Sequence, residues 1–411
     1  MQITGEEIER LRRQIMEQID LTRTVEDEEV YQLIEAQVRD FARERMLTLG
    51  EREAVVQTLF YSLRKLDVLQ ELLEDPAITE IMVNGAEHIF YEKAGRLYKA
   101  EYGFSSKEKL NDVIQQMAGY SNRMVNEASP IVDTRLADGS RVNIVLVAID
   151  GSAVTIRKFP ENPISMEDLI RMGSISQEAA DLLKILVRCG YNIFISGGTG
   201  SGKTTFLNAL SQYIPREERI ITVEDSAELQ LLDKPNLVRL ETRNANTEGV
   251  TPITIRDLIR TALRMRPERI IVGECRGAEA LDVLQAMNTG HDGSLSTGHA
   301  NSCKDMLSRL ETMVLMGMEL LPAIRSQIAS GIDILIHLGR LRDKSRKVLK
   351  IAEIAGMEQG EVMLHELFRY EESGEEARHV RGTLMRTGRL MHTEKCERAG
   401  MNPEKEGSSG L

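Results

Sequence analysis

The spacing of apolar residues changes twice along the chain, and each change marks a different kind of element. Over residues 1–72, apolar positions such as Val30, Ile34 and Val38 recur every three to four residues, with few Gly or Pro between them. This period predicts amphipathic helices with one buried face. We therefore expect an N-terminal module of three helices that packs on the rest of the chain or docks on a partner.

Residues 73–160 contain shorter apolar runs separated by turn signals. Asp138-Gly139 is a dipeptide typical of tight turns, and it lies between strand-like runs at 132–136 and 141–145. A helix within this region is expected to begin after Ser105, its capping residue. The pattern predicts a small α+β domain with an antiparallel sheet.

The second half of the chain predicts a different architecture. Pro163 marks a linker over residues 161–175, and Ser165 is expected to cap the helix that follows. Over residues 176–370, apolar strands alternate with helices, which predicts an α/β domain with a mostly parallel sheet covered on both faces. The expected strands are Ile193–Ser196, Ile220–Val223, Val238–Leu240, Ile270–Val272, Leu295–Thr297 and Ile332–Leu338. The polar composition of residues 371–411 predicts a weakly ordered tail.

The composition narrows the possible classes of function. The 411 residues include 64 acidic and 52 basic side chains, a net charge of −12, and 4% are aromatic. This balance argues against a nucleic-acid coat or a polybasic membrane anchor, so we expect no direct contact with nucleic acid. The basic run at 340–350 is interpreted as a solvated hairpin rather than a nucleic-acid site.

The targeting and redox signals are those of a cytoplasmic protein. The sequence shows no secretory signal and no apolar stretch long enough to span a bilayer. Its four cysteines lie far apart, without a C-x-x-C pair, as in proteins that keep their thiols reduced. Any contact with a membrane is therefore expected to be peripheral, through a partner protein.

A glycine-rich stretch stands between a strand-like run and a helix start. It is Gly197-Gly198-Thr199-Gly200-Ser201-Gly202-Lys203-Thr204-Thr205, which fits the G-x-x-x-x-G-K-T phosphate-binding loop. Glycines let backbone N–H groups curl around a phosphate, and the helix N-terminus adds positive partial charge. Lys203 is expected to reach the β- and γ-phosphates, and the Thr204 hydroxyl to bind Mg²⁺. The alternative is a solvated Gly/Ser loop, but the strand–turn–helix context favours binding of a nucleoside triphosphate.

Three further strands are expected to end in groups suited to phosphoryl transfer, which needs a metal, a group that orients water, and positive charge. Glu224 follows one apolar run, and its alternative interpretation is an acidic surface turn. Glu274 follows another, where P-loop enzymes place a carboxylate near magnesium, most often Asp. His299 follows a third and is either an ordinary core or surface histidine or a sensor of the γ-phosphate.

The loop and these strand ends, in this order and at these spacings, resemble the motifs of the type II/type IV secretion ATPase superfamily. Glu224–Leu229 resembles its Asp box, Arg264–Gly277 its Walker B region and Gln285–Asn301 its His box. Within that superfamily the chain resembles the CpaF-type ATPases of tight-adherence (Tad/Flp) pilus assembly, which are grouped with DNA-transfer secretion ATPases. The resemblance covers roughly residues 75–370.

The resemblance implies a RecA-like P-loop NTPase domain preceded by a small α+β domain, in a hexameric ring that holds ATP between the two domains. Lys203 and Thr204 would then hold the phosphates and Mg²⁺. Glu224 would be the catalytic carboxylate, Glu274 the Walker B carboxylate and magnesium ligand, and His299 the phosphate sensor.

Two arginines of the predicted α+β domain also match the family. Arg141 and Arg157 stand where the N-terminal domain of such enzymes offers arginines to the nucleotide, and both lie on predicted strands just before the linker. Their alternative interpretation is that of ordinary exposed strand residues.

As a function, the resemblance implies an ATP hydrolase that works as a motor. Closure of the domains on ATP and reopening after hydrolysis would drive assembly of a Tad/Flp-type pilus, or type II-like secretion, through inner-membrane platform proteins. One alternative is a nucleotide-dependent binding module without sustained turnover. Another is a DNA-transfer ATPase or nucleic-acid translocase, against which the net charge and low aromatic content argue.

Overall fold

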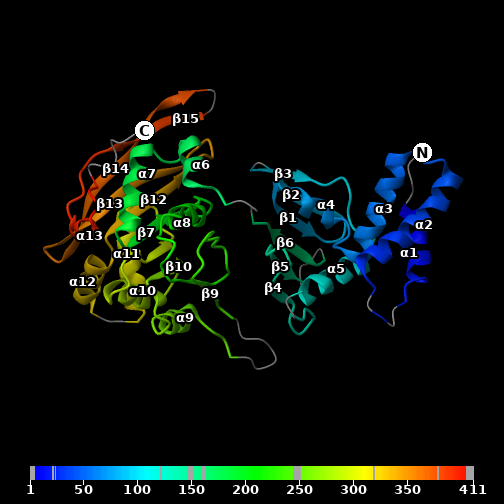
Figure 1. Cartoon of the computed structure of the whole chain (residues 1–411), viewed down its shortest axis with the longest axis horizontal. Coiled ribbons are helices and arrows are strands. Elements are labelled where there is room, and N and C mark those ends of the chain that lie inside the picture. Colours follow the sequence, from blue (N-terminus) through cyan, green and yellow to red (C-terminus); the bar gives the residue numbers. More distant parts are fainter. Residues whose placement is uncertain are drawn as a thin grey trace. The chain divides into compact units, whose positions relative to one another are not determined.

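The computed structural model describes residues 5–20, 23, 25–93, 95–120, 123–146, 151–159, 163–243, 251–317, 320–376 and 379–403. The chain divides into two compact units, Met1–Glu161 and Asn162–Leu411. Each unit has hydrophobic cores of its own, and Figure 1 labels the elements that surround them.

The first unit begins with a helical module. Helices α1, α2, α3 and α4 span Gly5–Met16, Asp27–Arg45, Leu49–Arg64 and Leu69–Glu74. The first three share a core that includes the buried side chains of Ile15, Phe41 and Leu59. Three amphipathic helices were predicted for this region, and the structure describes a fourth, because α3 ends at Arg64 and α4 begins at Leu69. Helix α4 belongs to the next core instead, because Leu69 and Leu72 pack there.

The rest of the first unit is an antiparallel sheet with one long helix. The strands are β1 Ile78–Asn84, β2 His88–Lys93, β3 Arg96–Lys99, β4 Ile131–Arg135, β5 Arg141–Val145 and β6 Ala153–Arg157. As described, their order is β3-β2-β1-β6-β5-β4. Helix α5, Lys107–Gly119, buries Val113 and Ile114 in the same core. Its cap is Ser106 and not the predicted Ser105, since the Ser106 side chain accepts the Lys109 N–H.

The second unit is built on a large, mainly parallel sheet. Its strands are β7 Ile193–Gly197, β8 Ile220–Glu224, β9 Leu237–Glu241, β10 Arg269–Cys275, β11 Leu295–Gly298, β12 Ile334–Arg340, β13 Arg346–Glu358, β14 Glu361–Glu376 and β15 His379–Arg386. As described, their order is β15-β14-β13-β12-β7-β11-β10-β8-β9. Strands β12, β7, β11, β10, β8 and β9 run parallel and include all six predicted strands.

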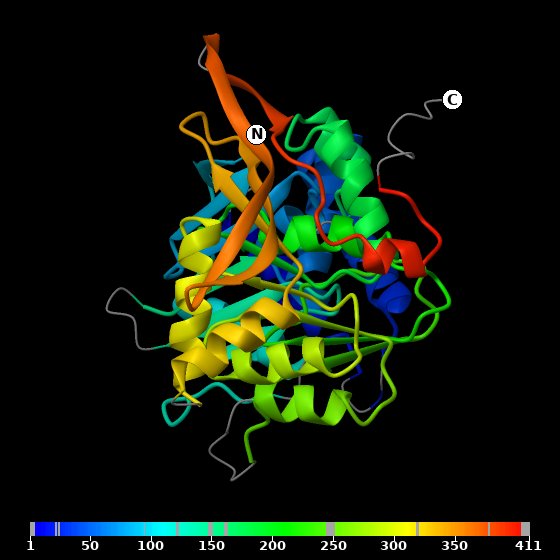
Figure 2. The ribbon, with the colours of Figure 1, turned by 90° about the vertical axis from the view of Figure 1, so that its left-hand side faces the viewer.

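Helices cover both faces of this sheet (Figure 2). They are α6 Met166–Arg171, α7 Gln177–Arg188 and α8 Lys203–Ser211 in one core, and α9 Ile255–Ala262, α10 Glu279–Asn288, α11 Cys303–Leu315 and α12 Leu321–Gly331 in the other. Neighbouring residues of β7 point into opposite cores: Ile193 and Ile195 into the first, Phe194 into the second. The segment predicted as a linker contains α6, whose Met166 packs in the first core.

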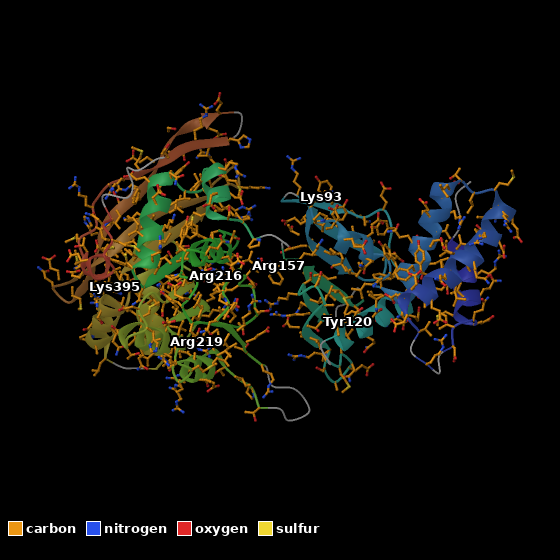
Figure 3. The ribbon with its side chains drawn as sticks, viewed as in Figure 1. Lys93, Tyr120, Arg157, Arg216, Arg219 and Lys395 are labelled. Carbon is orange, nitrogen blue, oxygen red and sulfur yellow. The ribbon has the colours of Figure 1, made fainter. Side chains whose placement is uncertain are left out.

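The predicted weakly ordered tail is wrong for residues 371–403. Strands β13, β14 and β15 extend the sheet by antiparallel pairing, and a short helix, α13 Glu394–Arg398, follows them. The buried Glu353 carboxylate accepts the N–H groups of Met391 and His392 at 2.7 and 2.8 Å. Lys395, labelled in Figure 3, donates to Asp333 at 2.7 Å. The polar composition reflects solvated strand faces, and residues 404–411 lie outside the described part.

Each of the four cysteines carries a free thiol. Over the ranges that the structure describes, no helix is both long and apolar enough to cross a bilayer.

Candidate functional site

The glycine-rich loop connects β7 to α8 at the carboxyl end of the parallel sheet. Gly197 is the last residue of β7, and Lys203 is the first of α8. Gly200 and Gly202 have φ angles of +69° and +93°, which side chains with a Cβ rarely adopt. A Cβ on Gly197 would lie 2.6 Å from the Leu338 carbonyl oxygen of β12. Glycine is therefore required here both for backbone conformation and for close packing.

The Lys203 side chain bridges the loop and the end of β11. Its Nζ donates to the carbonyl oxygens of Gly197 and Gly198, both at 3.1 Å. The same nitrogen lies 3.3 Å from Nδ1 of His299. Lys203 is buried, so the amine stands inside the cradle rather than in bulk solvent.

Glu274, near the end of β10, joins three strand ends. Its Oε1 lies 2.8 Å from Nε2 of His299, and its Oε2 accepts from Nη2 of Arg276 at 2.8 Å. Arg276 also reaches Asp225, just after β8, with 3.5 Å between Nη1 and Oδ2. Lys203, His299, Glu274 and Arg276 thus form one continuous chain of contacts.

Glu224, the last residue of β8, is buried beside this chain. Its Oε1 accepts the N–H groups of Glu228 and Leu229 at 2.7 and 2.9 Å. A Cβ on Gly273 would lie 3.0 Å from its Cγ, which places Glu224 against the strand that carries Glu274. The backbone contacts fix this carboxylate and make it more than an acidic surface turn.

Two depressions flank the loop. One of about 640 Å³ is lined by Gly198, Thr199, Arg276 and His299, together with the exposed side of α11. The other, of about 240 Å³, is lined by Ser201, Gly202, Thr205 and Phe206, together with α6 and the turn between β12 and β13. Thr204 stands between Lys203 and Thr205 in the first turn of α8. An elongated ligand lying along the loop would therefore have space at both ends.

The electrostatics of the site favour a neutral imidazole. Burial lowers the pKa of His299, and the nearby Lys203 ammonium lowers it further. A neutral His299 can accept from Lys203 at Nδ1, while its Nε2 lies close to Glu274 Oε1. Burial also lowers the pKa of Lys203, and Glu274 opposes that shift.

The oxygen ligands available near the loop suit Mg²⁺ bound together with a phosphate, and do not suit a metal ion held by protein side chains alone. The Thr204 hydroxyl stands in the first turn of α8, and Glu274 stands near the end of β10, which is separated from β7 by β11. Within the described ranges, no three His, Cys, Asp or Glu side chains converge as a metal site. Mg²⁺ characteristically keeps several waters and takes one or two protein oxygens plus phosphate. These residues therefore fit a magnesium ion that arrives with a nucleotide.

The two predicted arginines of the first unit are neighbours. Arg141 on β5 is directly opposite Arg157 on β6, and on its other side Arg141 pairs with Arg135 of β4. Arg157 is labelled in Figure 3. Arg141 lies 3.6 Å from Asp133, and Arg157 lies 4.0 Å from Glu80. Within its own unit, the structure therefore presents three arginines side by side.

Sequence reasoning missed two arginines that contact the site. Arg276 is two residues beyond Glu274, the strand period that puts both side chains on one side, and that spacing was a usable signal. Arg346 begins β13, and its Nε donates to the Gly200 carbonyl of the loop at 2.9 Å. The hairpin that carries it was predicted, but its position beside the loop depends on β12 pairing with β7, which no local pattern reveals.

Comparison with known proteins gives one family. Residues 62–402 match the model of the family described as type II/IV secretion system protein. A putative conjugal transfer protein of Mycobacterium tuberculosis is 34% identical over 323 residues, covering 76% of this chain and 91% of the relative. The type IV secretion system protein VirB11 of Brucella suis is 33% identical over 303 residues, covering 66% of this chain and 84% of the relative.

A solved structure shares the fold. The pilus retraction motor PilT, crystallised with bound ADP, aligns with a TM-score of 0.54 and 18% identity over 82% of this chain and 87% of PilT. At that identity the likeness is one of architecture. It confirms the predicted fold class, a RecA-like domain preceded by a smaller α+β domain.

Proposed function

The chain belongs to the type II/IV secretion system protein family, and from that premise we propose that it is an ATP hydrolase that drives secretion or pilus assembly. The observation that carries the proposal is the chain of contacts from Lys203 through His299 to Glu274. It joins the phosphate loop to two other strand ends, so that groups from distant stretches of sequence face one ligand.

In this proposal the second unit binds and orients the triphosphate. The loop N–H groups and Lys203 hold the phosphates, and His299 senses the γ-phosphate by exchanging its contact with Lys203. Glu224, fixed by two backbone N–H groups, orients the attacking water and takes up its proton. Magnesium, held by Thr204 and through Glu274, would supply charge neutralisation at the phosphate oxygens.

The first unit supplies the remaining positive charge. Arg276 is already engaged by Glu274 and Asp225, so it is poorly placed to serve the transition state. Arg141 and Arg157 meet that need if closure of the units, or assembly of copies, brings them to the nucleotide. The proposed assembly is a homohexamer at the cytoplasmic face of the membrane, docked on platform proteins.

Two systems are candidates for the work that this motor does. The order and spacing of the motifs favour assembly of a Tad/Flp-type pilus. The named relatives favour the second candidate, a DNA-transfer system, because one is called a conjugal transfer protein and another a type IV secretion protein. The net charge of −12 favours the first candidate, since a DNA-pumping ring needs basic surfaces.

The test is phosphate release by the purified full chain with ATP, with and without Mg²⁺. We expect Mg²⁺-dependent release that single-stranded DNA does not stimulate. Marked stimulation by DNA would favour the DNA-transfer candidate. Tight nucleotide binding without sustained release, even with membrane partners added, would show a binding module instead of a motor.

A further inference from the structure

The turn between β12 and β13 holds the phosphate loop from outside. Arg346 donates from Nε to the Gly200 carbonyl at 2.9 Å. Its Cδ lies 3.3 Å from the point where a Cβ on Gly202 would stand, so the aliphatic stem packs on that glycine. One side chain therefore contacts both loop residues that have a positive φ.

The same turn is fastened to the last two strands of the sheet, β14 and β15, which we call the ribbon (361–376 and 379–386). Arg342 makes two hydrogen bonds to Glu372, at 2.6 and 2.8 Å, and a third to Glu375 at 2.9 Å. The Asp343 carboxylate accepts the Val380 N–H of β15 at 2.8 Å. Arg346 is thus three residues from a junction with the ribbon.

The Asp343 contact is the stronger of the two attachments. Arg342 and its partners are exposed, and solvated ion pairs contribute little and weaken with salt. The Asp343 side chain is only 4% exposed and also accepts from the Ser345 hydroxyl and N–H. These hydrogen bonds, chiefly that of the Ser345 hydroxyl, lower the pKa of Asp343 to about 2, so it remains charged at neutral pH.

The far part of the ribbon is exposed on the second unit. Its far end projects from the body of the second unit in both views (Figures 1 and 2). Strand β15 is the edge of the sheet as described, and Glu371–Glu376 are exposed. The turn therefore lies between the exposed part of the ribbon and the backbone of the glycine-rich loop.

We propose that Arg346 is a positioning residue of the phosphate loop. We also propose that the turn couples the ribbon to the loop, so that loosening the contact between Asp343 and the ribbon lowers the affinity of the loop for nucleotide. The proposal rests on the proposed function, because it assumes that the loop binds nucleotide. Physically, phosphate binding needs the loop N–H groups to point inward, and a hydrogen bond on the outward Gly200 carbonyl favours that orientation. If the Lys203 amine turns to a phosphate, it gives up its hydrogen bonds to the Gly197 and Gly198 carbonyls. Arg346 can keep its hydrogen bond to the Gly200 carbonyl at the same time.

The first experiment measures equilibrium binding of MgATP and MgGTP to the full chain and its variants. We expect Arg346→Ala to weaken both nucleotides about fivefold, as for loss of one exposed hydrogen bond from a charged donor. Arg346→Lys, which keeps a donor, should recover part of that loss. Arg239→Ala is the control, since Arg239 is an exposed arginine on β9, at the other edge of the sheet as described, and this variant should bind nucleotide like the parent.

The second experiment tests this coupling by a double-mutant cycle. Asp343→Ala alone should weaken binding about twofold to threefold, and in the Arg346→Ala background it should have no further effect, because both act through one contact. If the two substitutions instead weaken nucleotide binding independently, so that their effects add in the double variant, the coupling between ribbon and loop is wrong. Unchanged binding in folded Arg346→Ala, or a changed ratio of ATP to GTP affinity, would overturn the positioning role. If the parent chain binds neither nucleotide, the proposed function itself fails.

Discussion

The two sheets of the molecule present opposite chemistry. The parallel sheet of the second unit ends in Glu224, Glu274 and His299 around a glycine cradle, and strands β7 and β8 are buried along their whole length. The antiparallel sheet of the first unit carries Arg135, Arg141 and Arg157 in one row on half-exposed strands. One edge is suited to a metal and a water molecule, and the other to an anion.

The side chains at the ends of the parallel strands and the arginines of the antiparallel sheet are also held in place in different ways. The acidic edge is fixed by burial and by backbone hydrogen bonds, as Glu224 shows. Like charges directly opposite each other in a sheet cost free energy, and the carboxylates of Asp133, 3.6 Å from Arg141, and Glu80, 4.0 Å from Arg157, help to offset that cost. We propose that this row of arginines serves a phosphate ligand.

The largest effect should follow removal of the cradle's own charge. Lys203→Ala deletes the amine that faces the phosphates, and we expect ATP turnover to fall by about 100-fold or more. Nucleotide affinity should fall with it, because the amine contacts the ligand in both the ground state and the transition state. Calorimetric binding and phosphate release measured on one preparation check this. Full turnover in the variant would place the chemistry elsewhere.

A second large effect should follow loss of the carboxylate that joins the strand ends. Glu274→Ala releases both His299 and Arg276, and we expect turnover to fall by about 100-fold. The stimulation of nucleotide binding by Mg²⁺ should shrink as well, measured by titrating Mg²⁺ at fixed ATP. A variant with unchanged Mg²⁺ dependence would remove Glu274 from the metal site.

The arginine row should matter for turnover and little for stability. Arg141→Ala and Arg157→Ala should each lower the rate of hydrolysis about 10- to 100-fold, less than for a lone arginine finger because neighbours share the charge. Thermal unfolding should barely move, since exposed pairs contribute little. Arg96→Ala, on exposed strand β3 of the same sheet, is the matched control. Equal rates in all three variants would leave the row as ordinary surface.

A smaller effect, on stability, tests whether buried hydrogen bonds also hold the segment after β15 against the sheet of the second unit. Glu353→Ala removes the buried acceptor of two backbone N–H groups, and we expect a loss of about 2 kcal/mol in the free energy of unfolding. Denaturant unfolding followed by circular dichroism measures it. A change below the error of that measurement would mean that residues 391–392 are held by other contacts.

The smallest effect concerns pH. Burial lowers the pKa of His337 below its ordinary 6.5, with Asp305 opposing, so the folded chain takes up this proton less readily than the unfolded chain does. The stability that results is fully present above pH 6.5 and is lost as pH falls through the lower folded value. His337→Asn should therefore narrow the stability difference between about pH 7.5 and about pH 5.5. An unchanged difference would assign the acid sensitivity to other groups.

The sequence predicted elements better than it predicted contacts between them. The loop, the six parallel strands and the Asp138-Gly139 hairpin were found because each has a local signature of period or turn chemistry. The convergence of Glu274 and His299 followed from the rule that parallel strands present their carboxyl ends together.

The features that the sequence did not predict depend on which strands are neighbours, on strand patterns hidden by a polar composition, or on a choice between adjacent residues. The positions of Arg276 and Arg346 require knowing which strands are neighbours. Residues 371–403 were predicted to be weakly ordered because their polar composition was given more weight than their alternation of apolar and polar residues. Val380 and Leu384 are nevertheless buried on one face of β15, at the even spacing of a strand. Ser105 and Ser106 are chemically equivalent as caps, so only the structure separates them.

We propose above all that Glu224 belongs to a nucleotide-hydrolysing site that the phosphate loop assembles. A single-turnover measurement tests it most directly: load the chain and its Glu224→Gln variant with MgATP, then follow the ratio of bound ADP to bound ATP. We predict equal loading, conversion to ADP in the parent and conversion slowed at least about 100-fold in the variant. Conversion at the parental rate in a folded, fully loaded Glu224→Gln chain would show that Glu224 has no part in hydrolysis.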